Sequence, residues 1–358
     1  MWSQFARVTA AVALALLPAL VPPTSRPAEA SRLAPEALPS VLGPAGQGQD
    51  VCPEPNDTFQ AACFLGAHSD ALGFLSNPND IDAYKIEVYD FNTDVHVEMP
   101  MMPAAYKIQL ADWNGDIIAT SESTGAGQAI DTTVDVPGAY YIFVHSERGG
   151  FSATQPYQIF RALTYPGASI PIRIFASDFR QGSKEAAEGE TEFATHSEDG
   201  GKYTIAMKIP GTAADPSFAW WTGFGPQVTD FTMTVDARVA NKTDAGFLVF
   251  FRHQDNDNTY AVGVDGKDGQ VQLMKLVNGE LTGTGWQPSE AVDVDGGVNR
   301  VVIRCFEDEI RVNVNGVEVF DLRDGSFQAG FIGIGGIAFG DPPVINFDNI
   351  IITTPTEG

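Results

Sequence analysis

The chain has 358 residues, 44% of them hydrophobic, so it is long and apolar enough to form two domains of ordinary size. Its formal net charge of −25 and its pI of about 4.3 would repel a phosphate backbone, which excludes nucleic acid as an expected partner. The same charge suits a soluble protein, or one that collects cations such as calcium.

The N-terminus has the three regions of a secretory signal peptide. "MWSQFAR" carries one arginine, "VTAAVALALLPALV" is apolar, and "PPTSRPAEA" ends in a small-residue cleavage site. This predicts a signal peptide over residues 1–30, cleavage after Ala30 and a secreted, extracellular protein. The apolar run is shorter than the about 20 residues of a membrane span, so no span is expected. Residues 31–49 are rich in Pro, Ala and Gly, which predicts a flexible linker.

The chain has three cysteines, and export permits a disulfide between two of them. Cys52 and Cys63 close a short loop and form the expected bridge, which contributes at most ~3 kcal/mol in the loop-entropy model. Cys305 lies in the alternating stretch "RVVIRCFEDEIRV", which favours a buried thiol over a catalytic one, because no histidine is spaced to partner it.

Both halves of the remaining chain have strand patterns, which predicts an all-β protein with two β-sandwich domains. The first spans residues 50–165, where apolar residues alternate and "WNGD" and "VPG" mark turns. A turn-rich hinge covers 166–171. The second spans 172–355 and is predicted to be a larger jelly roll, with hairpin turns at Asn278-Gly279 and Asn315-Gly316.

The first region resembles the bacterial pre-peptidase C-terminal domain family. The resemblance rests on "EPNDTFQAA" (54–62), "NDIDAYKIEV" (79–88), "VPGAYYIFV" (136–144) and the closing "YQIF". Domains of this family are secreted β-sandwiches that are commonly appended to exported peptidases. No peptidase domain follows here, so the resemblance leaves open an accessory role beside a separately encoded peptidase.

The second region resembles laminin G-like, or concanavalin A-like, jelly rolls, and is closest to the type related to family 16 glycosidases or to 3-keto-disaccharide hydrolases. The matching stretches are "SDF" (177–179), "DAGFLVFFRHQDNDNTYAVGV" (244–264), "NRVVIRCFEDEIRVNVNGVEV" (299–319) and "VINFDNIIIT" (344–353). Since many jelly rolls of this kind are binding modules, the resemblance implies a fold more strongly than an activity.

Two groups of polar residues are candidate calcium ligands. The first resemblance places the segment after Cys52 against the "NDIDAY" strand, which brings carboxylate and amide oxygens together. The alternative is that these residues form a turn and cap a strand. The candidates in this group are Glu54, Asn56, Asp57, Asp80 and Asp82. A second pair, Asp178 and Asp348, lies in the first and last strands of the second region; these residues either share a metal or satisfy turn amides.

Aromatic rings in the second region are candidates for stacking on sugars. The candidate rings are Trp220, Trp221, Phe224, Tyr260 and Trp286, and the polar loop "RHQDNDN" adds Asp255 and Asn256 as hydrogen-bonding groups. Adjacent Trp220 and Trp221 point to opposite faces if they lie on one strand, so one of them is expected in the core. Burial of these rings, and a plain solvated hairpin at the loop, are the alternatives.

Signatures of catalysis are mostly missing from the sequence. No metalloprotease, nucleophile-elbow or P-loop motif occurs, nor the alternating acidic run of family 16 glycosidases. The sequence therefore predicts an exported, non-catalytic protein that recognises extracellular or cell-surface carbohydrate and is stabilised by calcium. The alternatives are a hydrolase of glycosides or 3-keto-glycosides, and an accessory or adhesion partner of a secreted peptidase.

Overall fold

The computed structural model describes residues 52–66, 70–123, 127–167, 170–180, 188–294 and 296–355. The predicted signal peptide and linker lie outside these residues. All regular elements in the described part are strands, as the sequence predicts, and no helix there is long and apolar enough to cross a membrane. The strands up to Thr164 and the strands from Arg173 onward belong to different sheets. The predicted domain limits themselves stay predictions.

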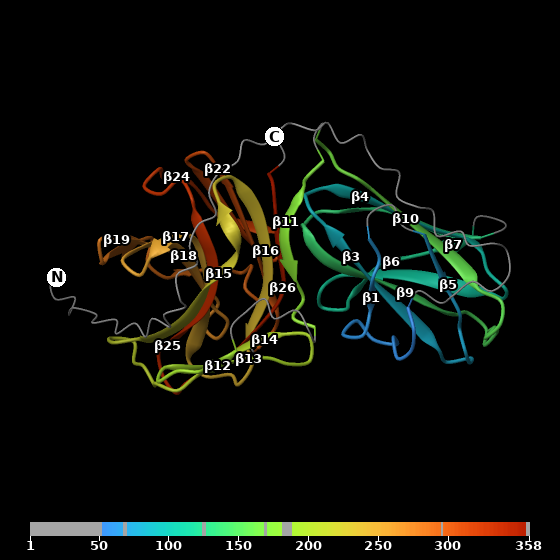
Figure 1. Ribbon diagram of the computed structural model, residues 1–358, viewed down its shortest axis with the longest axis horizontal. Coiled ribbons are helices and arrows are strands. Elements are labelled where there is room, and N and C mark those ends of the chain that lie inside the picture. The colour runs from blue at the N-terminus through green and yellow to red at the C-terminus, as the bar shows by residue number, and fades with distance from the viewer. Residues whose placement is uncertain are drawn as a thin grey trace, which may run out of the picture. The chain divides into compact units, whose positions relative to one another are not determined.

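Residues up to Thr164 form two five-stranded sheets, with orders β1-β3-β9-β5-β6 and β2-β10-β4-β8-β7 (Figure 1). Apolar side chains of both sheets share one core, so the sheets pack as a sandwich, here called the first sandwich. Its strands are β1 (Cys63–Phe64), β2 (Asp70–Gly73), β3 (Ile81–Val88), β4 (Thr93–Met101), β5 (Tyr106–Ala111), β6 (Ile117–Thr120), β7 (Glu122–Ser123), β8 (Gln128–Val134), β9 (Gly138–Ser146) and β10 (Tyr157–Thr164).

The second sandwich has a nine-stranded and a seven-stranded sheet. The nine-stranded sheet has the order β12-β13-β14-β26-β16-β22-β23-β24, and its ninth strand, β11, pairs with β26. These strands are β11 (Arg173–Ser177), β12 (Gly189–Glu190), β13 (Ala194–Glu198), β14 (Tyr203–Met207), β16 (Phe231–Val239), β22 (Asn299–Phe306), β23 (Glu309–Val314), β24 (Val317–Arg323) and β26 (Val344–Thr353). The first and last strands of this region pair with each other, with Ser177 opposite Ile350.

The seven-stranded sheet has the order β15-β25-β17-β18-β19-β20, and β21 also pairs with β19. Its inner face and that of the nine-stranded sheet share the largest core of the chain, which includes the buried thiol of Cys305. The strands are β15 (Ser217–Val228), β17 (Ala245–Asp255), β18 (Asn258–Asp265), β19 (Gln270–Val277), β20 (Glu280–Gly283), β21 (Gln287–Pro288) and β25 (Gly330–Ala338).

Several strands are buried on both faces, although one of their faces is polar. In β3, Tyr84 and Ile86 point into the first core, whereas Lys85 on the opposite face pairs with Asp178 of the second sandwich at 3.0 Å. In β22, Arg300 points away from its own core and donates to the Ala139 carbonyl of β9 at 3.1 Å. The polar faces of these strands are thus buried by contacts between the sandwiches, which lie in one compact unit.

Candidate functional site

The face of the seven-stranded sheet that points away from its core carries apolar side chains. Along β17, Phe247, Val249 and Phe251 point into the core, while Leu248 and Phe250 point to the opposite face. This is the two-residue period of a strand. A surface face of a sheet would ordinarily be polar, so the apolar character of this one calls for a functional explanation.

Glycines allow aromatic rings to lie directly on this face. A Cβ at Gly335 would come within 2.7 Å of the Trp220 Cβ atom, and a Cβ at Gly263 within 2.8 Å of the Trp286 ring. A side chain at Gly263 would displace the Trp286 indole, and a Cβ at Gly335 would clash with the Ala219 carbonyl oxygen at 2.6 Å and meet the Phe250 ring at 3.0 Å. Gly263 therefore provides a floor on which Trp286 rests, and Gly335, opposite Trp220 on the neighbouring strand, leaves room for Trp220 and Phe250.

Five rings gather on this outer face of the sheet, and together they are here called the aromatic face. Trp220 packs against Phe250 with ring centres 5.9 Å apart, and Trp286 packs edge-on against Phe339 at 5.6 Å. Phe250 is nearly buried, but the other four keep part of their surface exposed. The rings of the aromatic face are Phe218, Trp220, Phe250, Trp286 and Phe339. Such partly exposed rings offer a flat apolar surface to a ligand.

His253 adds a polar group beside these rings. Its ring centre lies 6.5 Å from that of Phe250, the residue is 7% exposed, and its Nδ1 atom is buried without a hydrogen-bond partner. Burial lowers the pKa of this imidazole, which is therefore neutral near pH 7. A neutral imidazole can accept a hydrogen bond through one nitrogen and donate through the other.

The structure sorts the predicted sugar-binding rings into two groups. Trp220 and Trp286 belong to the aromatic face, and Trp221 packs against the core, so the expectation that adjacent tryptophans divide between the faces is confirmed. Phe224 and Tyr260 are 0% and 1% exposed, so the prediction that they contact a ligand is wrong. Both are aromatic residues at inward positions of a strand, where the hydrophobic effect places them.

Asp255 and Asn256 lie at the tip of the hairpin between β17 and β18. Asp255 accepts hydrogen bonds through Oδ1 from the Asp257 amide at 2.8 Å and the Asn258 side chain at 2.9 Å. These bonds hold the pKa of Asp255 below its usual range. The side chain of Asp255 thus stabilises the turn, which is the alternative that the sequence left open. The tip also borders a shallow hollow of about 480 Å³ that Phe327 and Gln328 line.

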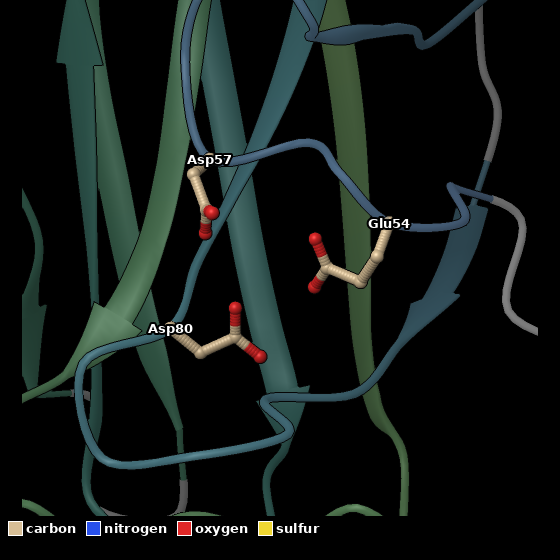
Figure 2. A group of neighbouring side chains, drawn as sticks. All are labelled: Glu54, Asp57 and Asp80. Carbon is tan, nitrogen blue, oxygen red and sulfur yellow. The ribbon is translucent and has the colours of Figure 1, made fainter.

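In the first sandwich, three carboxylates of the predicted calcium group converge. Figure 2 shows Glu54 and Asp57, from the segment after Cys52, turned toward Asp80, which precedes β3. Their oxygen atoms lie within 4.8 Å of one another. The Asn56 amide donates to Glu54 at 3.0 Å, the Ile81 amide donates to Asp57 at 3.2 Å, and the Ser76 amide donates to Asp80.

The electrostatics of this trio favour a bound cation. Burial, and then repulsion from Asp80 and Asp57, raise the pKa of Glu54. A divalent ion would remove that repulsion, and calcium prefers oxygen ligands of this kind. Asn56 is fully buried and its Oδ1 atom has no hydrogen-bond partner, so the segment holds one more oxygen that lacks a partner. These residues therefore fit a calcium ion.

Asp82, the remaining candidate of this group, has a structural role. Its Oδ1 accepts from the Asn56 side chain at 2.8 Å, and its Oδ2 accepts from the Tyr157 hydroxyl at 2.5 Å. Asn56 Nδ2 also donates to the Cys52 carbonyl at 2.7 Å. This network ties the start of the described chain to β3. The predicted Cys52–Cys63 disulfide is confirmed, with Cα atoms 5.6 Å apart.

Asp178 and Asp348 line the same cleft, but Asp178 already forms ion pairs with basic side chains. Asp178 lies 3.0 Å from Lys85 Nζ and 3.2 Å from Arg180 Nε. Although burial acts in the opposite direction, these two neighbours hold the pKa of Asp178 below its usual range. Because Lys85 and Arg180 would repel a metal ion, we do not retain the metal prediction for this pair.

The sequence reasoning missed a second acidic group, formed by Asp244, Asp265 and Asp268. Lys267 lies 2.8 Å from Asp244 and supplies a positive charge there. Phe218, Phe250, Phe339 and His253 were missed as well. The three phenylalanines lie two residues from other outward positions, as Phe218 does from Trp220, and this period was the available signal. His253 follows Phe250 by three residues across a β-bulge, so the period does not find it.

Residues 177–353 match the model of the 3-keto-alpha-glucoside-1,2-lyase-like domain family. No curated protein sequence matches the chain. Among solved structures, the chain is similar to the carbohydrate-binding module CBM66 from Bacillus subtilis, with 19% identity, a TM-score of 0.36, and coverage of 46% of this chain and 97% of the module.

Two further solved structures are similar to parts of the chain. A protein of unknown function with a galectin-like fold from Bacillus subtilis has 14% identity, a TM-score of 0.40, and coverage of 55% of this chain and 100% of its own. The pre-peptidase C-terminal domain of collagenase from Bacillus anthracis has 16% identity, a TM-score of 0.24, and coverage of 29% and 94%. Such distant similarities carry no inference about ligand or activity.

Proposed function

We propose that this chain is an exported carbohydrate-binding protein that holds a sugar ring against its aromatic face. The observation that carries the proposal is the pair of part-exposed indoles on the aromatic face, Trp220 opposite Gly335 and Trp286 directly over Gly263. The C–H groups on one side of a pyranose ring form an apolar surface that stacks on aromatic rings. The family match over residues 177–353 supports a glucoside as the class of ligand.

Polar recognition in this site would come from His253. Its buried Nδ1 atom lacks a partner, and a sugar hydroxyl beside Phe250 would supply one. A neutral imidazole suits hydroxyl groups, which donate and accept equally well. The proposed binding therefore combines stacking on the indoles with at least one directional hydrogen bond.

We also propose that calcium bound by Glu54, Asp57 and Asp80 stabilises the first sandwich. The ion would join the segment after Cys52 to the start of β3, next to the disulfide and the Asn56–Asp82 hydrogen bond. Its role would be structural, because the carboxylates lie in the first sandwich and the aromatic face in the second.

Substitution of the indoles tests the sugar-binding proposal. Glycan-array screening of the full chain identifies a ligand, and calorimetry then compares Trp220→Ala and Trp286→Ala with the unsubstituted protein. Loss of one stacking ring is expected to weaken binding by about tenfold or more, in line with the ~1–3 kcal/mol of ring stacking. Phe306→Ala is the matched control, because Phe306 is 37% exposed but lies outside the aromatic face. Unchanged binding in both tryptophan variants would refute the proposal.

Cleavage of a 3-keto-glucoside is the second candidate function. The family match and the neutral, buried His253 favour it, since an imidazole near neutrality can act as a general base. Incubation with a 3-keto-glucoside would release a free sugar, and His253→Gln would stop the release while weakening ligand binding only by the loss of one hydrogen bond, about tenfold or less. Binding without product release would support recognition alone. The accessory role beside a peptidase stays a prediction.

A further inference from the structure

A cleft of about 320 Å³ lies where the two sandwiches meet. Lys85, Trp113 and Tyr141 of the first sandwich form one wall. Asp348 and Asn349 of β26 belong to the opposite wall. The volume is at the lower end of the range for small-molecule sites, which corresponds to a ligand of about one sugar ring.

The cleft gathers positive charge in a strongly acidic chain. The whole chain has 21 Lys and Arg against 46 Asp and Glu, yet four of those cations line this one cleft. They are Lys85, Arg180, Lys202 and Arg238.

The three acids that line the cleft do not balance its four cations. Lys85 and Arg180 share Asp178, Asp236 is paired with Arg300 at 2.7 Å, and the third acid is Asp348. No ion pair joins Lys202 or Arg238 to an acid among the residues that the structure describes. The cleft therefore has cationic groups available for an anion.

Polar atoms without partners also occur in its walls. Asn349 is 4% exposed; its Nδ2 atom donates to Asp236 at 3.0 Å, but its Oδ1 atom has no partner. The Trp113 Nε1 atom is likewise buried without an acceptor. One buried acceptor and one buried donor in the cleft walls are thus left without partners, and hydroxyl groups of a ligand would complement both.

We propose that this cleft binds an acidic sugar residue, a uronate, at a site separate from the aromatic face. The carboxylate would lie between Lys202 and Arg238, and the ring hydroxyls would bind Asn349 Oδ1 and Trp113 Nε1. A simple inorganic anion would leave the Asn349 oxygen without a donor, and a neutral sugar would form no ion pair with the two cations, of which Arg238 is exposed and Lys202 half-buried. The uronate class satisfies both sets of groups.

Calorimetry with D-glucuronate and D-glucose on the full chain tests the proposal. Glucuronate is expected to bind at least about tenfold more tightly than glucose, equivalent to about 1.4 kcal/mol. Lys202→Gln combined with Arg238→Gln should reduce glucuronate binding by about tenfold or more. Trp113→Phe keeps an aromatic ring and removes only the donor, so a several-fold loss there supports the site even if the double variant fails to fold.

Two controls separate this site from general charge effects and from the aromatic face. Arg148 is exposed and lies outside the cleft, so Arg148→Gln should leave glucuronate binding unchanged. Trp220→Ala should also leave it unchanged, whatever it does to other glycans. No glucuronate binding, equal binding of glucose, or full binding by both cleft variants would overturn the proposal.

Discussion

Arg300 and Asp236 form an ion pair with two hydrogen bonds, from Nε to Oδ1 at 2.7 Å and from Nη2 to Oδ2 at 2.8 Å. The residues lie directly opposite each other on β22 and β16, and both are buried. Arg300 also lies over the Trp113 ring of the first sandwich, with Cζ 4.1 Å from the ring centre. The Arg300 side chain thus contacts both sandwiches: it pairs with Asp236 of the second and stacks on Trp113 of the first.

Breaking this pair should destabilise the chain strongly. Arg300→Met leaves the buried Asp236 carboxylate without its counter-ion, so the free energy of unfolding in urea should fall by about 3–5 kcal/mol. Arg323→Met is the control, because Arg323 and its partner Asp308 are 66% and 44% exposed; that change should cost at most about 1 kcal/mol. Equal losses in the two variants would contradict the structural role assigned to Arg300.

Asp348 should make stability depend on pH. Burial, and then Asp236 and Asp178, raise its pKa to about 7 against the opposing charge of Lys85. The folded chain holds this proton more tightly than the unfolded chain, whose carboxyl titrates near about 4. The contribution of Asp348 to stability is therefore present below about pH 4 and is lost as the pH rises to about 7.

Asp348→Asn removes that titration. Relative to the unsubstituted protein, the variant should gain stability as the pH rises from about 4.5 to about 8, because the ionised carboxylate is the form that burial disfavours. Thermal melting of both proteins at the two pH values measures the change. If the difference in melting temperature between the two proteins is the same at both pH values, Asp348 titrates normally and the prediction is wrong.

Calcium should raise the melting temperature of the chain. An ion that binds only the folded state stabilises it by about 2.7 kcal/mol at a concentration one hundred times its dissociation constant. Melting with calcium and with a chelator measures the shift, and Glu54→Gln combined with Asp57→Asn should abolish it. Asp244→Asn is the control at the other acidic group and should preserve the shift. A shift that survives the first double substitution would place the ion elsewhere.

The three cysteines should differ in reactivity. Burial raises the pKa of the Cys305 thiol to about 12, and the residue is fully buried, so a thiol reagent should detect no free thiol in the native chain and one after unfolding. Reduction of the Cys52–Cys63 bridge should lower stability by at most ~3 kcal/mol, as for a short loop. Two further thiols in the unfolded, unreduced protein would show that the bridge does not form.

The disulfide, the all-β class and the opposite orientation of Trp220 and Trp221 could be predicted because each depends on local information. Cys52 and Cys63 are close in the chain, and the alternation of side chains along a strand is a property of the backbone. The convergence of Glu54 and Asp57 on Asp80 was predicted through a resemblance, and the structure places all three together.

The pairing of distant strands decided the rest. Trp220, Phe250, Trp286 and Phe339 lie on different strands or beyond them, and only the order of the seven-stranded sheet brings them to one face. Which aromatic residues are buried, as Phe224 and Tyr260 are, depends on which face of each strand the second sheet covers. The sequence by itself determined the strands, the charge and the local bridge, because short-range sterics and hydrophobic periodicity specify them. Only the tertiary structure decided the aromatic face and the cleft between the sandwiches, because contacts between residues far apart in the chain create both.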